Sequence, residues 1–264
     1  MKTRIITAVI AALLFVPFVI YGGVPLAVLI YVIAAIGFFE MLKMRNLRLF
    51  SVPGILGLLA LFSMLMPEQW STAVEQATSY SKLEWLMILV ALLLIYVVLK
   101  KNKFTFDDVG FLIASVFYVG VGFFYFMQTR DAGIVYIVFA LVIVWTTDSG
   151  AYFVGRKLGK HKLWPEISPK KTVEGFVGGI VIAVIATVVF QLIVDLDVSW
   201  AILLIVAVIA SVVGQLGDLV ESAIKRHYGV KDSGKILPGH GGILDRFDSL
   251  LFVLPLLHFL HFIG

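Results

Sequence analysis

Residues 217–248 read GDLVESAIKRHYGVKDSGKILPGHGGILDRFD, and this polar stretch interrupts a chain that is otherwise strongly apolar. It carries ten charged side chains, two histidines and a Pro-Gly-His-Gly-Gly turn, between two apolar runs that are each long enough to cross a bilayer. Charged groups next to the hydrocarbon core are costly, and they usually face a polar cavity or an opposite charge. We therefore expect this stretch to bind a ligand rather than merely to join two helices.

The composition of the chain is that of a polytopic membrane protein. Of its 264 residues, 61% are hydrophobic and only 14% are charged, whereas a soluble domain averages about 25% charged residues. We therefore predict an all-α integral membrane protein. The net charge of +4 is concentrated at the ends of apolar segments, so we predict no nucleic-acid partner. Because cysteine is absent, any metal site must use carboxylates, imidazoles or substrate phosphates.

Nine apolar segments of bilayer-spanning length follow one another along the chain. They cover residues 5–21, 24–42, 50–66, 83–99, 108–127, 133–154, 173–194, 199–224 and 243–263. The first resembles a signal peptide, but no small-residue cleavage site follows it, so we predict a retained helix. The polar segment 67–82 is expected to be a solvated linker. We expect about five spans in residues 1–130 and a catalytic membrane region in residues 131–264, with cytoplasmic loops at 155–172 and 225–242.

The basic residues predict the orientation of these helices. With a cytoplasmic N-terminus, 19 of the 21 lysines and arginines fall in cytoplasmic segments, and only Lys82 and Arg130 do not. This bias is what the positive-inside rule requires of nine helices with the C-terminus outside. The short loops and simple N-terminus favour the inner (plasma) membrane, with the endoplasmic reticulum as the alternative.

Two further polar places lie on the predicted cytoplasmic side. Asp148 falls within the sixth apolar segment, where a carboxylate needs a cation, a polar cavity or a hydrogen bond to a neighbouring helix. Lys170 and Lys171 precede the predicted start of the seventh helix, with Thr172 as its N-cap. Lysines beside the unpaired N–H groups of a helix start can bind phosphate, although they also fit the positive-inside bias.

The stretch 217–248 itself divides into three parts. A continued eighth helix would place four polar residues on one face, at i, i+3, i+4 and i+7: Asp218, Glu221, Ser222 and Lys225. Such a face could hold a metal and a phosphate, or form a ladder of internal ion pairs. The glycine-rich turn at 238–242 exposes N–H groups that could wrap an anion. Asp245 and Asp248, one turn apart, suit a hard cation such as Mg²⁺ or simply an acidic helix start.

The run from Ser222 to Asp248 resembles the signature of the phosphatidate cytidylyltransferases, also called CDP-diacylglycerol synthases. It reads S-x-x-K-R-x4-K-D-x-G-x-x-L-P-G-H-G-G-x-x-D-R-F-D, with no departure from that signature over its 27 positions. The segments around Asp148 and at 168–175 are also similar to this family. The resemblance covers the C-terminal half of the chain, and residues 1–130 contribute hydropathy alone.

The resemblance implies an enzyme of phospholipid biosynthesis that transfers CMP from CTP to phosphatidic acid, giving CDP-diacylglycerol and pyrophosphate. It implies a requirement for Mg²⁺, as one ion or two. On that basis the metal ligands are predicted to be Asp148, Asp218, Asp245 and Asp248, and the catalytic residues Asp218, Lys225, Asp245 and Asp248. The substrate-binding residues are predicted to be Lys170, Lys171, Ser222, Arg226, Lys231, Gly239, His240, Gly241, Gly242 and Arg246.

The predicted substrate contacts divide between the two substrates. Lys225, Arg226 and Lys231 are expected to bind the triphosphate of CTP, and the loop from Gly239 to Gly242 to pack against the nucleotide. Lys170 and Lys171 are expected to reach the lipid phosphate or the leaving pyrophosphate.

Other classes of protein share parts of this pattern. A cation-coupled transporter would also carry acids within its spans, but its polar residues would gather at the bilayer midplane between repeats. A polyprenol kinase, or another nucleotide-dependent lipid enzyme, would use the same metal chemistry. The predicted partners are CTP, phosphatidic acid and the bilayer. A GxxxG pair at Gly175 and Gly179 permits close helix contact, either within one chain or in a homodimer.

Overall fold

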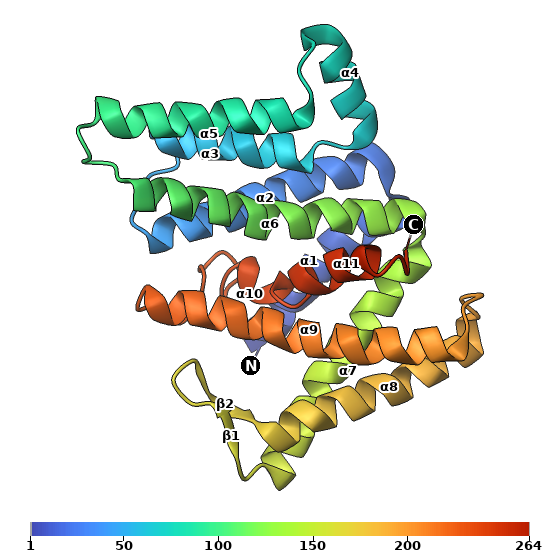
Figure 1. The fold of residues 1–264 in the computed structure, drawn as a ribbon. Coiled ribbons are helices and arrows are strands. Elements are labelled where there is room, and N and C mark those ends of the chain that lie inside the picture. The colour runs from blue at the N-terminus through green and yellow to red at the C-terminus, as the bar shows by residue number, and fades with distance from the viewer. Residues whose placement is uncertain (1, 264) are drawn as a thin grey trace. The chain divides into compact units, whose positions relative to one another are not determined.

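Helices make up almost all of the regular structure (Figure 1), and the computed structural model describes residues 2–263. The helices are α1 (Lys2–Tyr21), α2 (Gly23–Met44), α3 (Val52–Leu65), α4 (Glu68–Thr78), α5 (Lys82–Leu99), α6 (Phe106–Ala132), α7 (Ile134–Leu158), α8 (Val173–Val194), α9 (Trp200–His227), α10 (Leu244–Phe247) and α11 (Leu250–Phe259). Two short strands, β1 (Lys162–Trp164) and β2 (Ser168–Thr172), form an antiparallel hairpin between α7 and α8.

The class predicted from the sequence, an all-α polytopic membrane protein, is confirmed. Six of the described helices are long and apolar enough to cross a membrane, namely α2, α5, α6, α7, α8 and α9. Helices α3 and α4 pass the same test only as a pair bent by 115°, and the apolar helices at Ile6–Tyr21 and Leu250–Phe259 are shorter. Each predicted apolar segment except the last coincides with one helix, whereas the total of nine spans and their orientation remain predictions. The side chains of Lys2 and Arg4, which contributed to that orientation, lie outside the described part of the chain.

Three local predictions were wrong. The expected linker at 67–82 contains α4, whose residues are all at least partly exposed, because a polar segment can form an amphipathic helix without entering a core. The expected loop at 155–172 contains the last turn of α7 and the β1–β2 hairpin. The expected helix at 243–263 is divided into α10 and α11, and at the break the Ser249 N–H donates to the Asp248 carboxylate at 2.7 Å. Short polar side chains compete with the helix ladder in this way.

The described chain forms two compact units. The first comprises the residues up to Met127 together with Asp232–Leu244, and the second comprises Gln128–Lys231 together with the residues from Asp245 onward. The glycine-rich turn therefore packs in the unit that holds the N-terminal helices. The functional division at residue 130, into a membrane part and a catalytic part, remains a prediction.

In the first unit, the end of α2 lies against the start of α6. The Arg45 guanidinium donates to the Asp108 carboxylate at 2.9 Å, and this carboxylate also accepts the N–H of Thr105, the residue before α6, at 2.9 Å. The basic residues at 43–48 and the loop that precedes α6 are thus at the same end of this unit. This agrees with the interpretation of both basic clusters as topology signals.

In the second unit, α7 and α8 lie side by side (Figure 1) and approach each other through glycines. A Cβ atom at Gly175 would lie 2.8 Å from the Ala151 carbonyl oxygen, and one at Gly179 would lie 2.8 Å from that of Thr147. Small residues allow two membrane helices to pack this closely. Of the two alternatives for the GxxxG pair, these contacts support packing within the chain and not a homodimer.

Candidate functional site

The long helix α9 carries the first group of predicted site residues. It runs without a break to His227. Its N-terminal part is apolar, and its last turns present polar side chains on one face. The Ser222 hydroxyl donates to the Asp218 carboxylate at 3.4 Å, and the Lys225 ammonium donates to Glu221 at 2.6 Å. These i, i+4 contacts confirm the predicted continuation of the helix and the shared face.

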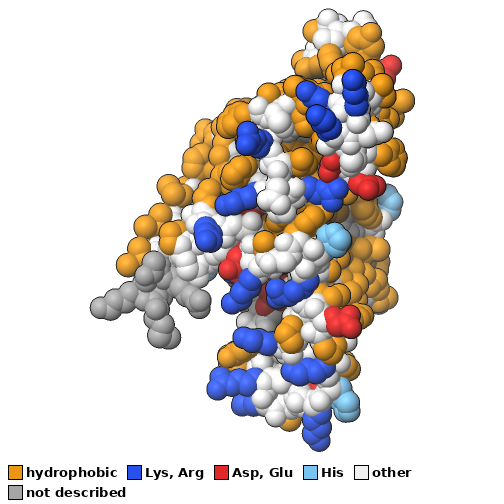
Figure 2. Space-filling view, turned by 90° about the vertical axis from the view of Figure 1, so that its left-hand side faces the viewer, with side chains coloured by type: hydrophobic (Ala, Val, Ile, Leu, Met, Phe, Trp, Pro, Cys, Tyr) orange, Lys and Arg blue, Asp and Glu red, His pale blue; other side chains and the backbone are white. Residues whose placement is uncertain are grey.

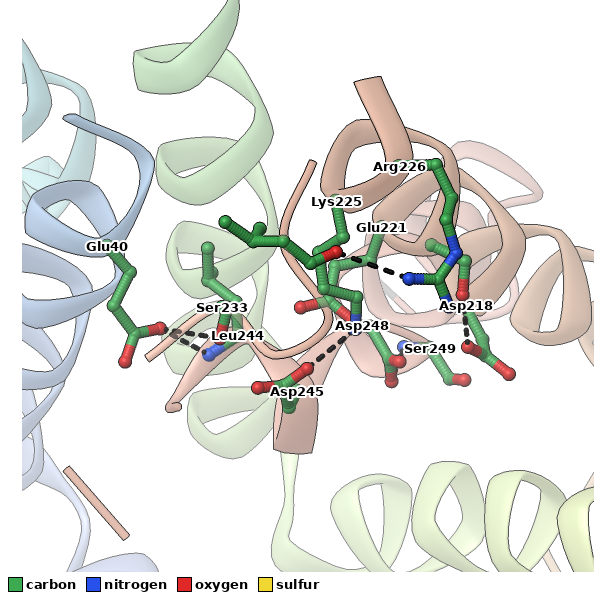
Figure 3. Close-up of polar contacts among 12 residues, drawn as sticks. Glu40, Asp218, Glu221, Lys225, Arg226, Ser233, Leu244, Asp245, Asp248 and Ser249 are labelled. Carbon is green, nitrogen blue, oxygen red and sulfur yellow. Dashed lines mark hydrogen bonds and ion pairs between the residues drawn. The ribbon is translucent and has the colours of Figure 1, made fainter. Parts of the chain in front are cut away.

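Lys225 lies between two carboxylates. Its Nζ atom is 2.6 Å from Glu221 Oε2 and 2.6 Å from Asp245 Oδ1, and Figure 3 shows it directed at Asp245. All three side chains are nearly removed from solvent, with exposed fractions of 10% for Lys225, 1% for Glu221 and 7% for Asp245. The second Glu221 oxygen, Oε1, is buried without a hydrogen-bond partner among the described residues. Glu221 and Asp245 therefore share one lysine, and Glu221 Oε1 remains an unused acceptor among the described residues.

A second ion pair joins the hairpin to α9. Lys171 Nζ lies 2.5 Å from Asp218 Oδ2 and 3.4 Å from the Gln215 carbonyl oxygen. The hairpin is held at this place because Thr172, the last residue of β2, caps α8 by accepting the Gly175 N–H at 3.1 Å. The prediction that Thr172 is the N-cap is confirmed.

Asp148 and Asp248 lie within electrostatic range of this pair. Asp148 interacts with the charges of Asp218, Lys171 and Arg246, and Asp248 interacts with those of Asp218 and Asp148. Residues from α7, β2, α9 and the segment after α10 thus converge. Three carboxylates that repel one another, with Lys171 and Arg246 near them, form a site that a further cation would stabilise.

A cavity of about 440 Å³ opens beside these residues. Its polar lining includes Asp148, Asp218, Lys170, Lys171 and Arg156, and its apolar lining includes Ala151, Leu163 and Phe176. Acidic, basic and apolar walls in one cavity suit a ligand that has both a charged group and a hydrocarbon part.

The remaining basic residues of the prediction have different surroundings. Arg226 is exposed and donates to the carbonyl oxygens of Ile167 at 3.3 Å and Val230 at 3.2 Å, so it ties the hairpin to the end of α9. Lys231 and Arg246 are exposed. An exposed lysine or arginine can still meet a phosphate, and the triphosphate contacts of Arg226 and Lys231 stay predictions.

The predicted anion loop lies in the other compact unit. Gly239 and Gly241 have φ values of 78° and 88°, which only glycine adopts readily, and the Leu237 N–H donates to the Gly241 carbonyl at 3.0 Å to close the turn. The Nδ1 atom of His240 is buried without a hydrogen-bond partner in the described chain. The N–H groups just beyond the turn bind Glu40, an acid of α2.

Two acids with buried contacts, Glu221 and Glu40, were not among the site residues predicted from the sequence. Glu221 was placed on the polar face of α9 but assigned no role, and Glu40 was not singled out at all. The signal for Glu40 was available, since it is an acid within an apolar span, as Asp148 is. Its partners could not be identified, because nothing in the local sequence links residue 40 to residues 233–244.

No group of three or more histidine, aspartate or glutamate side chains in residues 6–263 is already arranged as a metal site. Two of the four carboxylates predicted to bind metal contact lysines: Asp218 binds Lys171, and Asp245 binds Lys225.

Comparison with known proteins matches the chain to one family over nearly its whole length. The model of the cytidylyltransferase family covers residues 2–263. The phosphatidate cytidylyltransferase of Bacillus subtilis is 55% identical over 263 residues, which cover 98% of this chain and 97% of the relative. The phosphatidate cytidylyltransferases of Staphylococcus haemolyticus and Staphylococcus epidermidis are 51% and 49% identical, each with 98% of both chains covered.

Proposed function

Since the chain belongs to the cytidylyltransferase family, we propose that it catalyses the reaction named for its relatives, the transfer of a cytidylyl group from CTP to phosphatidate. The products are CDP-diacylglycerol and pyrophosphate, and the reaction serves phospholipid biosynthesis. The observation that carries this conclusion is an identity of 49–55% to such enzymes over 98% of the chain. A transporter is not favoured, because the charged residues form ion pairs around a cavity at the end of α9 and no repeat is present in the sequence.

The reaction itself explains why the site needs charge more than a base. An oxygen of the phosphatidate phosphate attacks the α-phosphorus of CTP, and the bond from that phosphorus to the bridging oxygen of pyrophosphate breaks. The nucleophile is already anionic, so no strong general base is required. The barrier comes from bringing two anions together, and positioned cations lower it.

The acidic cluster fits the Mg²⁺ that the family resemblance implies. Hard cations prefer oxygen ligands and take carboxylates together with substrate phosphates. Asp148, Asp218 and Asp248 repel one another, and Glu221 Oε1 is a buried acceptor without a donor in the described chain, so the acids favour an added cation. Asp148, Asp218, Asp245 and Asp248 would hold it, and Glu221 is a further candidate ligand. The bound metal would neutralise charge on the phosphates.

The ion pairs Lys171–Asp218 and Lys225–Asp245 allow the carboxylates to exchange a lysine for a metal ion. A metal held by Asp218 and Asp245 would compete with Lys171 and Lys225 for these carboxylates, and the two lysines would then bind phosphate oxygens. Lys171 and Lys170 line the cavity, which supports their assignment to the lipid phosphate or the pyrophosphate, and Arg156 lines it as well. Lys225, with Arg226 and Lys231, would bind the triphosphate.

We place the reaction on the cytoplasmic side of a cell inner membrane. The distribution of lysine and arginine supports this, since the site lies at the end of α9 that carries Lys225 and Arg226, with Arg156 and Lys157 at the end of α7. Figure 2 shows many lysine and arginine side chains on the face that it presents, with apolar side chains along its borders. CTP is available on that side.

An assay with the purified protein in detergent, labelled CTP, phosphatidate and Mg²⁺ tests the function. Formation of a lipid that carries labelled CMP, dependent on both phosphatidate and the metal, is the expected result. Transfer of labelled phosphate to a polyprenol would indicate a kinase instead, and no turnover of either kind would contradict the proposal.

A further inference from the structure

A single acid of α2 binds three groups of the segment 232–244. The carboxylate of Glu40 accepts the N–H of Ile243 at 2.9 Å through Oε1, and the N–H of Leu244 at 3.0 Å through Oε2. The Ser233 hydroxyl donates to Oε2 at 3.0 Å. Glu40 is only 3% exposed, and Figure 3 shows its side chain extended from α2 toward Ser233 and Leu244. Both ends of the segment are therefore bound to one carboxylate.

The local sequence leaves room for this carboxylate. A Cβ atom at Gly234 or at Gly242 would collide with the Glu40 carboxylate, and one at Gly37, one turn earlier in α2, would lie 3.0 Å from the Leu244 side chain. The segment approaches α2 closely because glycines occupy these places. The same glycine-rich composition that was expected to wrap a substrate anion surrounds an anion of the chain itself.

The bonds of Glu40 lie next to Asp245, a predicted catalytic residue, in the chain. An acid within a membrane span is costly and is rarely found without a function. The two N–H groups that Glu40 binds belong to the residues directly before Asp245, whose carboxylate lies 2.6 Å from Lys225. Glu40 therefore holds the backbone that immediately precedes Asp245 in the chain.

We propose that Glu40 is a positioning residue for cytidylyl transfer, which acts by fixing the glycine-rich turn and the backbone that leads into Asp245. The proposal rests on the proposed function for its kinetic consequence, although the contacts themselves do not depend on it. Glu40 is not proposed to contact either substrate. It acts through the segment 232–244.

The test compares Glu40→Gln with the wild-type protein in two measurements. Glutamine keeps the size of the side chain but has one carbonyl oxygen, and its NH₂ group opposes the second backbone N–H. We expect kcat to fall by about tenfold to a hundredfold, because a misplacement of about 1 Å has effects of that size. The KM for phosphatidate is expected to stay within about twofold, because the contacts shown for Glu40 are with the segment 232–244 and do not include Lys170 or Lys171. Trypsin should also cleave faster after the exposed Lys235, which lies inside the segment.

Asp108→Asn is the matched control, since it removes an acid of the same compact unit that binds Arg45 rather than the segment. It should lower the melting temperature slightly while kcat and the cleavage at Lys235 stay at wild-type values. If Glu40→Gln does not fold, Ser233→Ala and Gly234→Ala carry the test, because the first removes one bond to the carboxylate and the second displaces it.

The outcomes separate this proposal from the proposed function. A kcat within twofold of wild type for Glu40→Gln, or for both substitute variants, together with unchanged cleavage at Lys235, overturns the role of Glu40. Absence of CDP-diacylglycerol formation by the wild-type protein would contradict the proposed function, and the cleavage rates would still report on the contacts of Glu40.

Discussion

The acids around α9 and the acid in α2 bind different kinds of partner. Glu221 and Asp245 bind Lys225, and Asp218 binds Lys171. Glu40 instead binds two backbone N–H groups and a hydroxyl. An ion pair can give up one ion for another, such as a metal or a phosphate, whereas a backbone N–H group stays where the fold holds it. The first arrangement therefore suits charge that is exchanged during a reaction, and the second suits fixed geometry.

Asp248→Asn should give the largest effect on the acidic side of this comparison. Asparagine has nearly the same shape but cannot neutralise a metal, so turnover should fall by about 1,000-fold or more. The melting temperature in metal-free buffer should not fall, because the change removes repulsion from Asp218 and Asp148. Initial rates and thermal unfolding in detergent measure both quantities. Turnover close to that of the wild type would contradict the assignment of Asp248 to the metal.

Lys225→Met should break the central triad. Methionine is unbranched like lysine and one atom shorter, so it removes the cation between Glu221 and Asp245 without adding bulk. Loss of one partner from a buried ion pair costs about 3–5 kcal/mol. We expect a clear fall in melting temperature, and added Mg²⁺ should restore part of it if the acids bind the metal. The double variant Lys225→Met with Glu221→Gln is the control, and it should be more stable than the single variant because one uncompensated charge is gone.

Lys171→Ala and Lys170→Ala should distinguish the contributions of two neighbouring lysines to turnover. Lys171 contacts Asp218, whereas Lys170 is exposed at the same cavity. Loss of a preorganised cation costs about a hundredfold in kcat, so we expect that loss for Lys171→Ala and a fall of about tenfold or less for Lys170→Ala. Rates at varied phosphatidate concentration measure the difference. Equal effects of the two variants would show that the contact with Asp218 has no special part in turnover.

Asp108→Asn should have the smallest effect of these substitutions on stability and turnover. Its ion pair with Arg45 is partly exposed, with exposed side-chain fractions of 17% for Asp108 and 27% for Arg45. Such pairs contribute about 1 kcal/mol or less. Thermal unfolding should show a small decrease, and kcat should not change. A large loss of activity would mean that this end of the first unit takes part in the reaction.

The sequence predicted those features of the site that depend on local spacing. The periodicity of residues 199–224 and the polar face beyond it predicted an unbroken α9, and the position of Thr172 predicted the start of α8. The convergence of Asp148, Lys171 and Asp218 followed from placing three polar segments at one membrane face.

Features that have no signal in local spacing or hydropathy could not be predicted in this way. Lys162 pairs with Thr172 in the hairpin. The many basic residues of this segment do not indicate a strand, and the hairpin depends on the packing of α7 against α8. The break after α10 depends on a bond between adjacent residues, Asp248 and Ser249, which has no hydropathy signal. The partners of Glu40 are a tertiary contact, and single-sequence patterns contain no information about it.

The bond between Glu40 and Ile243 has a consequence for how the protein is made. The two residues are 203 positions apart, so α2 is synthesised and inserted long before its donors exist. Until residues 233–244 arrive, the membrane holds an acid that lacks these hydrogen bonds. Synthesis of residues 233–244 supplies these donors, and a nascent protein halted before residue 232 therefore carries in α2 an acid that lacks them.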